Sequence, residues 1–200
     1  MKPRVIALIS LAVVITFLTN CNNHGDTKLN QPLSQILNVS TLVKLKDLKI
    51  PKDEIKGDFN GDGVLDYAWL VPPKETACAD CSGDCTSYIM FSDSSIPSIK
   101  IKMCIGGSPT NLGDLNKNGT DEIGLLPDWC TSCWRAYNVY TLKNDKWIFA
   151  VDPIITHCNQ WEEGIKPIEK DPDKDGNVLI RYSEFTEKDI VTKTKSVPVK

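Results

Sequence analysis

The chain has 200 residues, of which 41% are hydrophobic and 24% are charged, and 23 lysines and arginines against 26 aspartates and glutamates leave a net charge of −3. This length and composition are typical of one globular domain with a hydrophobic core. The near-balance of charge excludes a strongly basic surface, so we expect no nucleic-acid partner.

The N-terminus has the pattern of an export signal. Lys2 and Arg4 precede an apolar run over 5–18, which is short for a membrane-spanning helix and typical of a signal peptide. The next residues, Leu18-Thr19-Asn20-Cys21, resemble the lipobox of bacterial lipoproteins. That resemblance implies a signal peptide over 1–20, acyl chains such as palmitate on Cys21, and a flexible tether over 21–31. It places the protein in the bacterial cell envelope, anchored to a membrane outside the cytoplasm; a plain signal peptide or an uncleaved anchor is the alternative.

The segment 57–66 carries oxygen-bearing side chains at alternating positions. These residues are Asp58, Asn60, Asp62 and Asp66. Gly63 allows a sharp turn, and the backbone carbonyl of Val64 fills the gap in the series. Such alternation is how a short loop surrounds a hard cation, so we expect a structural Ca²⁺ here. Mg²⁺, or a loop that is only a turn, is the alternative.

The same pattern returns in 113–122. The equivalent side chains are those of Asp114, Asn116, Asn118 and Glu122, and the equivalent carbonyl is that of Thr120. Asparagine replaces aspartate at one position, and the lower charge predicts a weaker calcium site.

Each loop begins a unit of β-strands. Apolar, β-branched and aromatic runs separated by turn residues predict three strands after each loop. The expected strands are 67–71, 88–91 and 98–103 after the first loop, and 123–126, 137–140 and 146–151 after the second. The chain is therefore predicted to be mainly β, with antiparallel meander units at about 57–104 and 113–158.

Both loops resemble those of FG-GAP (VCBS-type) repeats, which build integrin-like β-propeller blades and bind Ca²⁺. The resemblance covers about half of the mature chain and implies that the side chains named above, with the carbonyls of Val64 and Thr120, are the calcium ligands. A closed propeller needs about four or more blades. The domain, over 32–200, is therefore expected to form packed sheets or a partial propeller.

A third acidic turn, Asp171-Pro172-Asp173-Lys174-Asp175-Gly176, begins in the same way. Its ninth position is Leu179, whose side chain has no oxygen. Asp-Gly before an alternating apolar run is a hairpin signal in itself, so we expect a turn without metal in a C-terminal hairpin over 165–199.

Seven cysteines follow Cys21. They are Cys78, Cys81, Cys85, Cys104, Cys130, Cys133 and Cys158. In an exported domain they favour disulfides, and their odd number leaves one unpaired or bound to another chain. Cys85 and Cys133 stand before the second strand of their units, whereas Cys104 and Cys158 follow the third. These equivalent positions predict disulfides Cys85–Cys104 and Cys133–Cys158.

Two further hypotheses concern the same cysteines. Trp129-Cys130-Thr131-Ser132-Cys133 resembles a thioredoxin-type redox site, but such chemistry depends on a helix N-terminus that the pattern does not predict here. A zinc site could use Cys130, Cys133, Cys158 and His157, although an oxidising compartment favours disulfides.

No catalytic constellation can be assembled from the sequence, because His24 lies in the tether and His157 lies beside a cysteine. The expected function is that of a calcium-stabilised binding module, tied to the membrane by its lipid and directed at a protein or glycan. A thiol–disulfide oxidoreductase using Cys130 and Cys133, or an inhibitor or immunity-type protein for an envelope enzyme, is the alternative.

Overall fold

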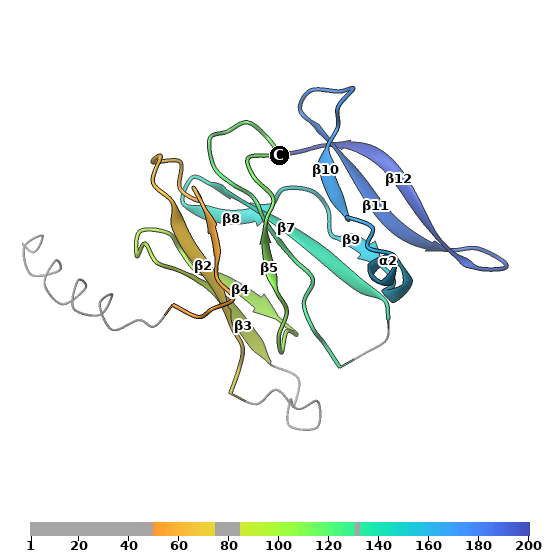
Figure 1. Ribbon diagram of the computed structural model, residues 1–200, viewed down its shortest axis with the longest axis horizontal. Coiled ribbons are helices and arrows are strands. Elements are labelled where there is room, and N and C mark those ends of the chain that lie inside the picture. Colours follow the sequence, from red (N-terminus) through yellow and green to blue (C-terminus); the bar gives the residue numbers. More distant parts are fainter. Residues whose placement is uncertain (1–49, 75–84, 131–132) are drawn as a thin grey trace, which may run out of the picture. The chain divides into compact units, whose positions relative to one another are not determined.

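The computed structural model describes residues 50–74, 85–130 and 133–200. The predicted signal peptide, lipidated Cys21 and tether lie outside these residues, and so do Cys78 and Cys81. The described chain is mainly β, as predicted, and its strands form antiparallel sheets (Figure 1).

The first sheet contains the first acidic loop. Its strands are β1 (Ile55–Gly57), β2 (Asp66–Val71), β3 (Thr86–Phe91) and β4 (Ile99–Lys102), which pair in sequence order. Side chains along β3 alternate: Ile89 and Phe91 are buried, whereas Tyr88 and Met90 face solvent. This period of two is that of a strand with one face in the core.

The second sheet repeats this order around the second loop. Its strands are β5 (Pro109–Asn111), β6 (Ile123–Leu125), β7 (Arg135–Lys143) and β8 (Lys146–Phe149), and β9 (Ile154–Thr156) also pairs with β7. The sequence did not predict β9, which makes this sheet five-stranded.

The third sheet contains β10 (Ile168–Lys170), β11 (Asn177–Phe185) and β12 (Ile190–Pro198). A short helix, α2 (Cys158–Glu162), connects it to β9, and the side chain of His157 caps the helix by accepting from the amide of Asn159. No helix in the described ranges is long and apolar enough to span a membrane.

The strand pairs that close the two loops are equivalent. Gly57 pairs with Asp66 across the first loop. Across the second, the amide of Glu122 donates to the carbonyl of Gly113 at 3.1 Å. The first and last residues of each loop are thus held opposite one another, by a β-ladder pair in the first loop and by a backbone hydrogen bond in the second.

The second sheet contributes to two hydrophobic clusters. Ile123, Leu125 and Tyr140 pack with Phe59 of the first acidic loop and with buried residues of the first sheet, including Phe91. Tyr137 and Val139 pack instead with residues of the third sheet, including Val178. The sheets therefore bury their faces against one another and form no closed barrel among the described residues, in agreement with the predicted mainly β fold.

Candidate metal centres in the acidic loops

In the first loop, the carboxylate of Asp58 is surrounded by backbone amides. Its Oδ1 accepts from the amides of Gly61 (2.7 Å) and Asp62 (3.2 Å), and its Oδ2 accepts from that of Gly63 (2.9 Å). Gly61 and Gly63 have φ of 79° and 80°, a left-handed conformation that glycine adopts without strain. The chain therefore curls around this carboxylate.

The second loop forms two of these three hydrogen bonds. Oδ1 of Asp114 accepts from the amide of Asn118 and Oδ2 from that of Gly119, both at 3.1 Å. Lys117 and Gly119 have φ of 62° and 89°, at the positions of Gly61 and Gly63. The loops thus follow one backbone path despite different residues.

The middle positions of the loops also correspond. Oδ1 of Asn60 accepts from the amide of Asp62 at 3.1 Å, and Oδ1 of Asn116 accepts from that of Asn118 at 3.0 Å. Two residues later, Asp62 accepts from the amide of Val64 at 2.7 Å, and Asn118 accepts from that of Thr120 at 2.8 Å.

The last carboxylate of each loop is buried and incompletely bonded. Asp66 is 6% exposed and Glu122 is 0% exposed. Among the buried side-chain polar atoms of the described ranges, Oδ2 of Asp66 and Oε1 of Glu122 are the two without a hydrogen-bond partner. Burying a polar atom without a hydrogen-bond partner reduces the stability of the folded state, so we expect each of these oxygens to bind a ligand.

Burial shifts both carboxyl pKa values upward. Desolvation, followed by the negative charges of Asp93 and Asp62, raises the pKa of Asp66 to about 6. Desolvation likewise raises the pKa of Glu122 to about 7, although the hydrogen bond from the Leu115 amide to Oε2 opposes it. A cation beside either carboxylate would stabilise its ionised form and lower its pKa.

Asp93 is a site residue that sequence reasoning missed. It follows β3, and the amide of Ser92 donates to the carbonyl of Tyr67 at 2.9 Å, so the β2–β3 hairpin places Asp93 opposite Asp66. Oδ2 of Asp93 accepts from Nδ2 of Asn60 at 3.1 Å. A prediction of the register of the β2–β3 hairpin from the sequence would have placed Asp93 beside the loop.

The corresponding residue beside the second loop is uncharged. Ile123 pairs with Tyr140, which places Thr141 opposite Glu122. The hydroxyl of Thr141 accepts from Nδ2 of Asn116 at 3.2 Å. The first site therefore gathers four carboxylates, from Asp58, Asp62, Asp66 and Asp93, whereas the second gathers those of Asp114 and Glu122.

The third acidic turn has a different structure. The amide of Asp173 donates to Oδ1 of Asp171 at 3.0 Å, and the amide of Asn177 closes the β10–β11 turn on the carbonyl of Lys174 at 3.1 Å. The other oxygen of Asp171 accepts from the hydroxyl of Ser196. Both oxygens of its carboxylate thus have hydrogen-bond partners within the protein, and the turn without metal stays a prediction.

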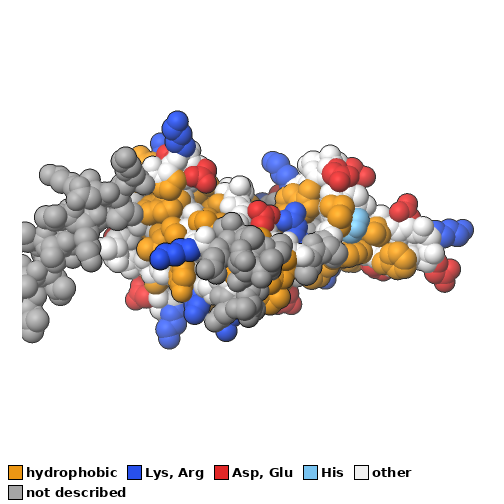
Figure 2. Space-filling view, turned by 90° about the horizontal axis from the view of Figure 1, so that it is seen from below, with side chains coloured by type: hydrophobic (Ala, Val, Ile, Leu, Met, Phe, Trp, Pro, Cys, Tyr) orange, Lys and Arg blue, Asp and Glu red, His pale blue; other side chains and the backbone are white. Residues whose placement is uncertain are grey.

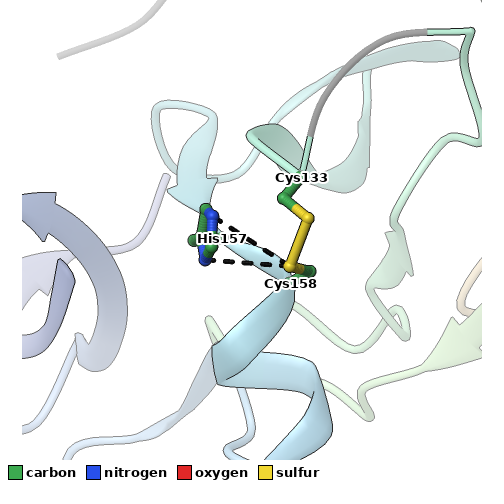
Figure 3. Close-up of side chains that lie close together, drawn as sticks. All are labelled: Cys133, His157 and Cys158. Atoms are coloured by element: carbon green, nitrogen blue, oxygen red, sulfur yellow. Dashed lines mark hydrogen bonds between the residues drawn. A yellow bond between two sulfur atoms is a disulfide. The ribbon is translucent and has the colours of Figure 1, made fainter.

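Another group of potential ligands lies at the start of α2. Cys133 and Cys158 form a disulfide, and the ring nitrogens of His157 lie 3.8 and 4.0 Å from Sγ of Cys158 (Figure 3). Within the described chain, this trio alone brings three His, Cys, Asp or Glu ligand atoms within 4.8 Å of one another. In the acidic loops the carboxylate oxygens therefore lie farther apart than these three ligand atoms do. The sulfur atoms of Cys133 and Cys158 are bonded to one another, so neither is available as the thiolate that a zinc site would need.

The other predicted disulfide, Cys85–Cys104, is wrong. Cys104 is a buried free thiol whose Sγ donates to the carbonyl of Gly106 at 3.1 Å. Cys85 is bonded in another disulfide, although the amide of Cys104 donates to its carbonyl at 3.1 Å. The backbones of Cys85 and Cys104 are therefore hydrogen-bonded, as the equivalence of the two units predicts, but their sulfur atoms are not bonded to one another.

The two cysteines of the Trp-Cys-x-x-Cys segment are not bonded to one another. Cys133 is bonded to Cys158, and Cys130 belongs to a different disulfide. Cys133 is followed by strand β7, whereas a thioredoxin-type site places its cysteines at a helix N-terminus, which lowers the thiol pKa.

Comparisons with protein-family models, with curated proteins and with solved structures found no match.

Proposed function

We propose that the protein is a calcium-stabilised binding module of FG-GAP (VCBS) type, exported as a lipoprotein and held at the bacterial envelope, where it binds a protein or glycan and catalyses no reaction. The observation that carries the calcium proposal is the pair of buried, unpartnered oxygens on Asp66 and Glu122. They close two loops whose hydrogen bonds match position by position. Because each loop leaves one buried carboxylate oxygen without a hydrogen-bond partner, the same kind of ligand best explains both loops.

Electrostatics support a cation in the first loop most strongly. The carboxylates of Asp58, Asp62 and Asp93 all raise the pKa of Asp66, and none of them forms an ion pair within the described chain. A hard divalent cation suits a set made only of oxygen ligands. Asp58, Asn60, Asp62, Asp66 and the Val64 carbonyl would hold it, with Asp93 beside them.

In the second loop the ligands would be Asp114, Asn116, Asn118, Glu122 and the Thr120 carbonyl. This set carries less charge, so calcium should bind there more weakly. The bound ions would hold the strands on either side of each loop together and would rigidify the sheets for binding.

Thermal unfolding with calcium or with a chelator tests this proposal. Calcium that binds only the folded state stabilises it by about 2.7 kcal/mol at a hundredfold excess over Kd. We expect the chelator to lower Tm, and Asp58→Ala to remove most of that sensitivity. Asp173→Ala, in the third acidic turn, is the matched control and should retain it. An equal Tm with calcium and with chelator would refute the proposal.

A further inference from the structure

A cavity of about 720 Å³ lies between β5, at the edge of the second sheet, and β10, at the edge of the third. Thr110 and Asn111 line it from one strand, and Ile168, Glu169 and Lys170 line it from the other. The apolar side chains of Leu126, Tyr137 and Trp161 also line this cavity. Neither acidic loop supplies its walls with a predicted metal ligand.

The backbone of β10 offers unused hydrogen-bonding groups on the side away from β11. The amide of Arg181 donates to the carbonyl of Pro167 at 2.8 Å, and the amide of Asp171 donates to the carbonyl of Asn177 at 3.1 Å. In an antiparallel pair such bonds alternate along the strand, so those of Glu169 also face β11. The N–H and C=O groups of Ile168 and Lys170 therefore face away from it, and no other described strand pairs with β10.

The charges around the cavity are unequally neutralised. Asp128 pairs with Arg135 at 2.7 Å, and Glu169 pairs with Arg181. Lys166 and Lys170, by contrast, are exposed and have no ion-pair partner among the described residues. The free charge at this cavity is therefore positive.

We propose that the cavity binds an extended acidic peptide, which adds a strand to the open edge of β10. A strand bonds to a sheet edge through its backbone, places alternate side chains on the apolar lining and can direct the others to the lysines. A glycan would leave the backbone groups of Ile168 and Lys170 without regularly spaced partners. This inference goes beyond the calcium proposal and does not depend on it.

The opposite edge of the third sheet, β12, is less suited to such pairing. Like β10 it carries lysine, at Lys193 and Lys195, but none of its residues lines the cavity. The open edge of β10 is the one beside the apolar lining, so the two edges are not equivalent as docking sites.

Fluorescence anisotropy with the full chain and a labelled hexapeptide of alternating valine and glutamate tests the proposal. Two further peptides are N-methylated, one on its valines and one on its glutamates. Only alternate residues of an added strand bond to β10, so one methylated peptide should bind about tenfold more weakly and the other should bind as before. Lys166→Glu with Lys170→Glu should also weaken binding about tenfold, whereas Lys143→Glu should not.

Each contrary outcome overturns the proposal. These outcomes are no saturable binding of the unmodified peptide, equal binding of both methylated peptides, and unchanged binding by the double lysine variant. Binding of a chitooligosaccharide in place of the peptide would assign the cavity to a glycan. A concentration-dependent dimer that is lost in the lysine variant would assign it to a second copy. Melting curves with and without calcium keep this result separate from the metal proposal, since the lysine variant should retain its calcium response.

Discussion

Asp58 and Asp121 join the two acidic loops directly. The amide of Asp58 donates to Oδ2 of Asp121 at 3.1 Å, and the amide of Asp121 donates to the carbonyl of Asp58 at 2.7 Å. Oδ2 of Asp121 also accepts from Nδ2 of Asn111 at 2.9 Å. Asp58 is the first proposed ligand of the first loop, and Asp121 directly precedes Glu122, the last proposed ligand of the second loop. The two proposed sites are thus connected through these hydrogen bonds.

This contact predicts that the two sites bind calcium cooperatively. An ion that orders Glu122 should also fix Asp121 and, through it, Asp58, with a coupling of about 1 kcal/mol. Calcium titrations of Glu122→Gln should therefore show weaker binding at the first loop than in the parent protein. In a protein that carries Asp121→Ala, adding Glu122→Gln should leave calcium binding at the first loop unchanged. If Glu122→Gln still weakens that binding, the two sites are coupled through contacts other than Asp121.

The raised pKa of Glu122 predicts an unusual pH dependence without calcium. The folded state holds this proton up to about pH 7, but a fully exposed glutamate loses it at about 4.5. Because the folded state then binds the proton more tightly, its free energy of unfolding should fall as pH rises from about 4.5 to 7, by roughly 3 kcal/mol. Urea unfolding in chelator across this range measures the change.

Calcium should oppose that trend, because its ligands must be deprotonated and its binding therefore weakens as pH falls through about 7. Glu122→Gln should make the curve obtained in chelator less steep, with the remaining slope coming from the raised pKa of Asp66. Glu162→Gln, at an exposed position, should leave the curve as it is. Parallel curves for the parent protein and Glu122→Gln would contradict the assignment.

Asp93→Asn should have opposite effects in the two conditions. Removing a negative charge beside Asp66 relieves repulsion, so the calcium-free protein should gain stability of order 1 kcal/mol near neutral pH. Removing the same charge should weaken calcium binding at the first loop. Unfolding in chelator and calcium titration measure the two effects, and a loss of stability in chelator would argue against electrostatic repulsion at this site.

The Cys133–Cys158 disulfide closes a sequence separation of 25 residues between the start of β7 and the start of α2. A closed loop of this size predicts a loss of about 3 kcal/mol when Cys158→Ser removes the bond. Cys104→Ser is the control, because a hydroxyl can still donate to the Gly106 carbonyl and no disulfide is lost. Peptide mapping after alkylation under denaturing, non-reducing conditions should find Cys104 labelled; a Cys85–Cys104 disulfide would contradict the structure.

The features predicted from sequence are those set by residues close in the chain. Asp58 and Gly63 fix the first loop through bonds over five residues, and the apolar alternation after it predicts β2 and β3. The predicted strand over 137–140 extends in the structure to Arg135–Lys143, because β9 and β8 pair with its two ends.

The features missed depend on contacts between distant segments. Asp93 meets the first loop only because β3 returns beside β2, and Asn60 reaches it across 33 residues. The wrong pairing of Cys85 with Cys104 has the same origin: the sequence places both near the ends of paired strands, but a disulfide also depends on side-chain direction.

Isothermal titration of calcium into the chelator-treated full chain tests the central claim most directly. We predict two binding events, the tighter at the first loop; Asp66→Asn should remove the tighter event, and Glu122→Gln the weaker. A titration without binding, or with the same two events in both variants, would contradict the claim that these buried carboxylates hold calcium.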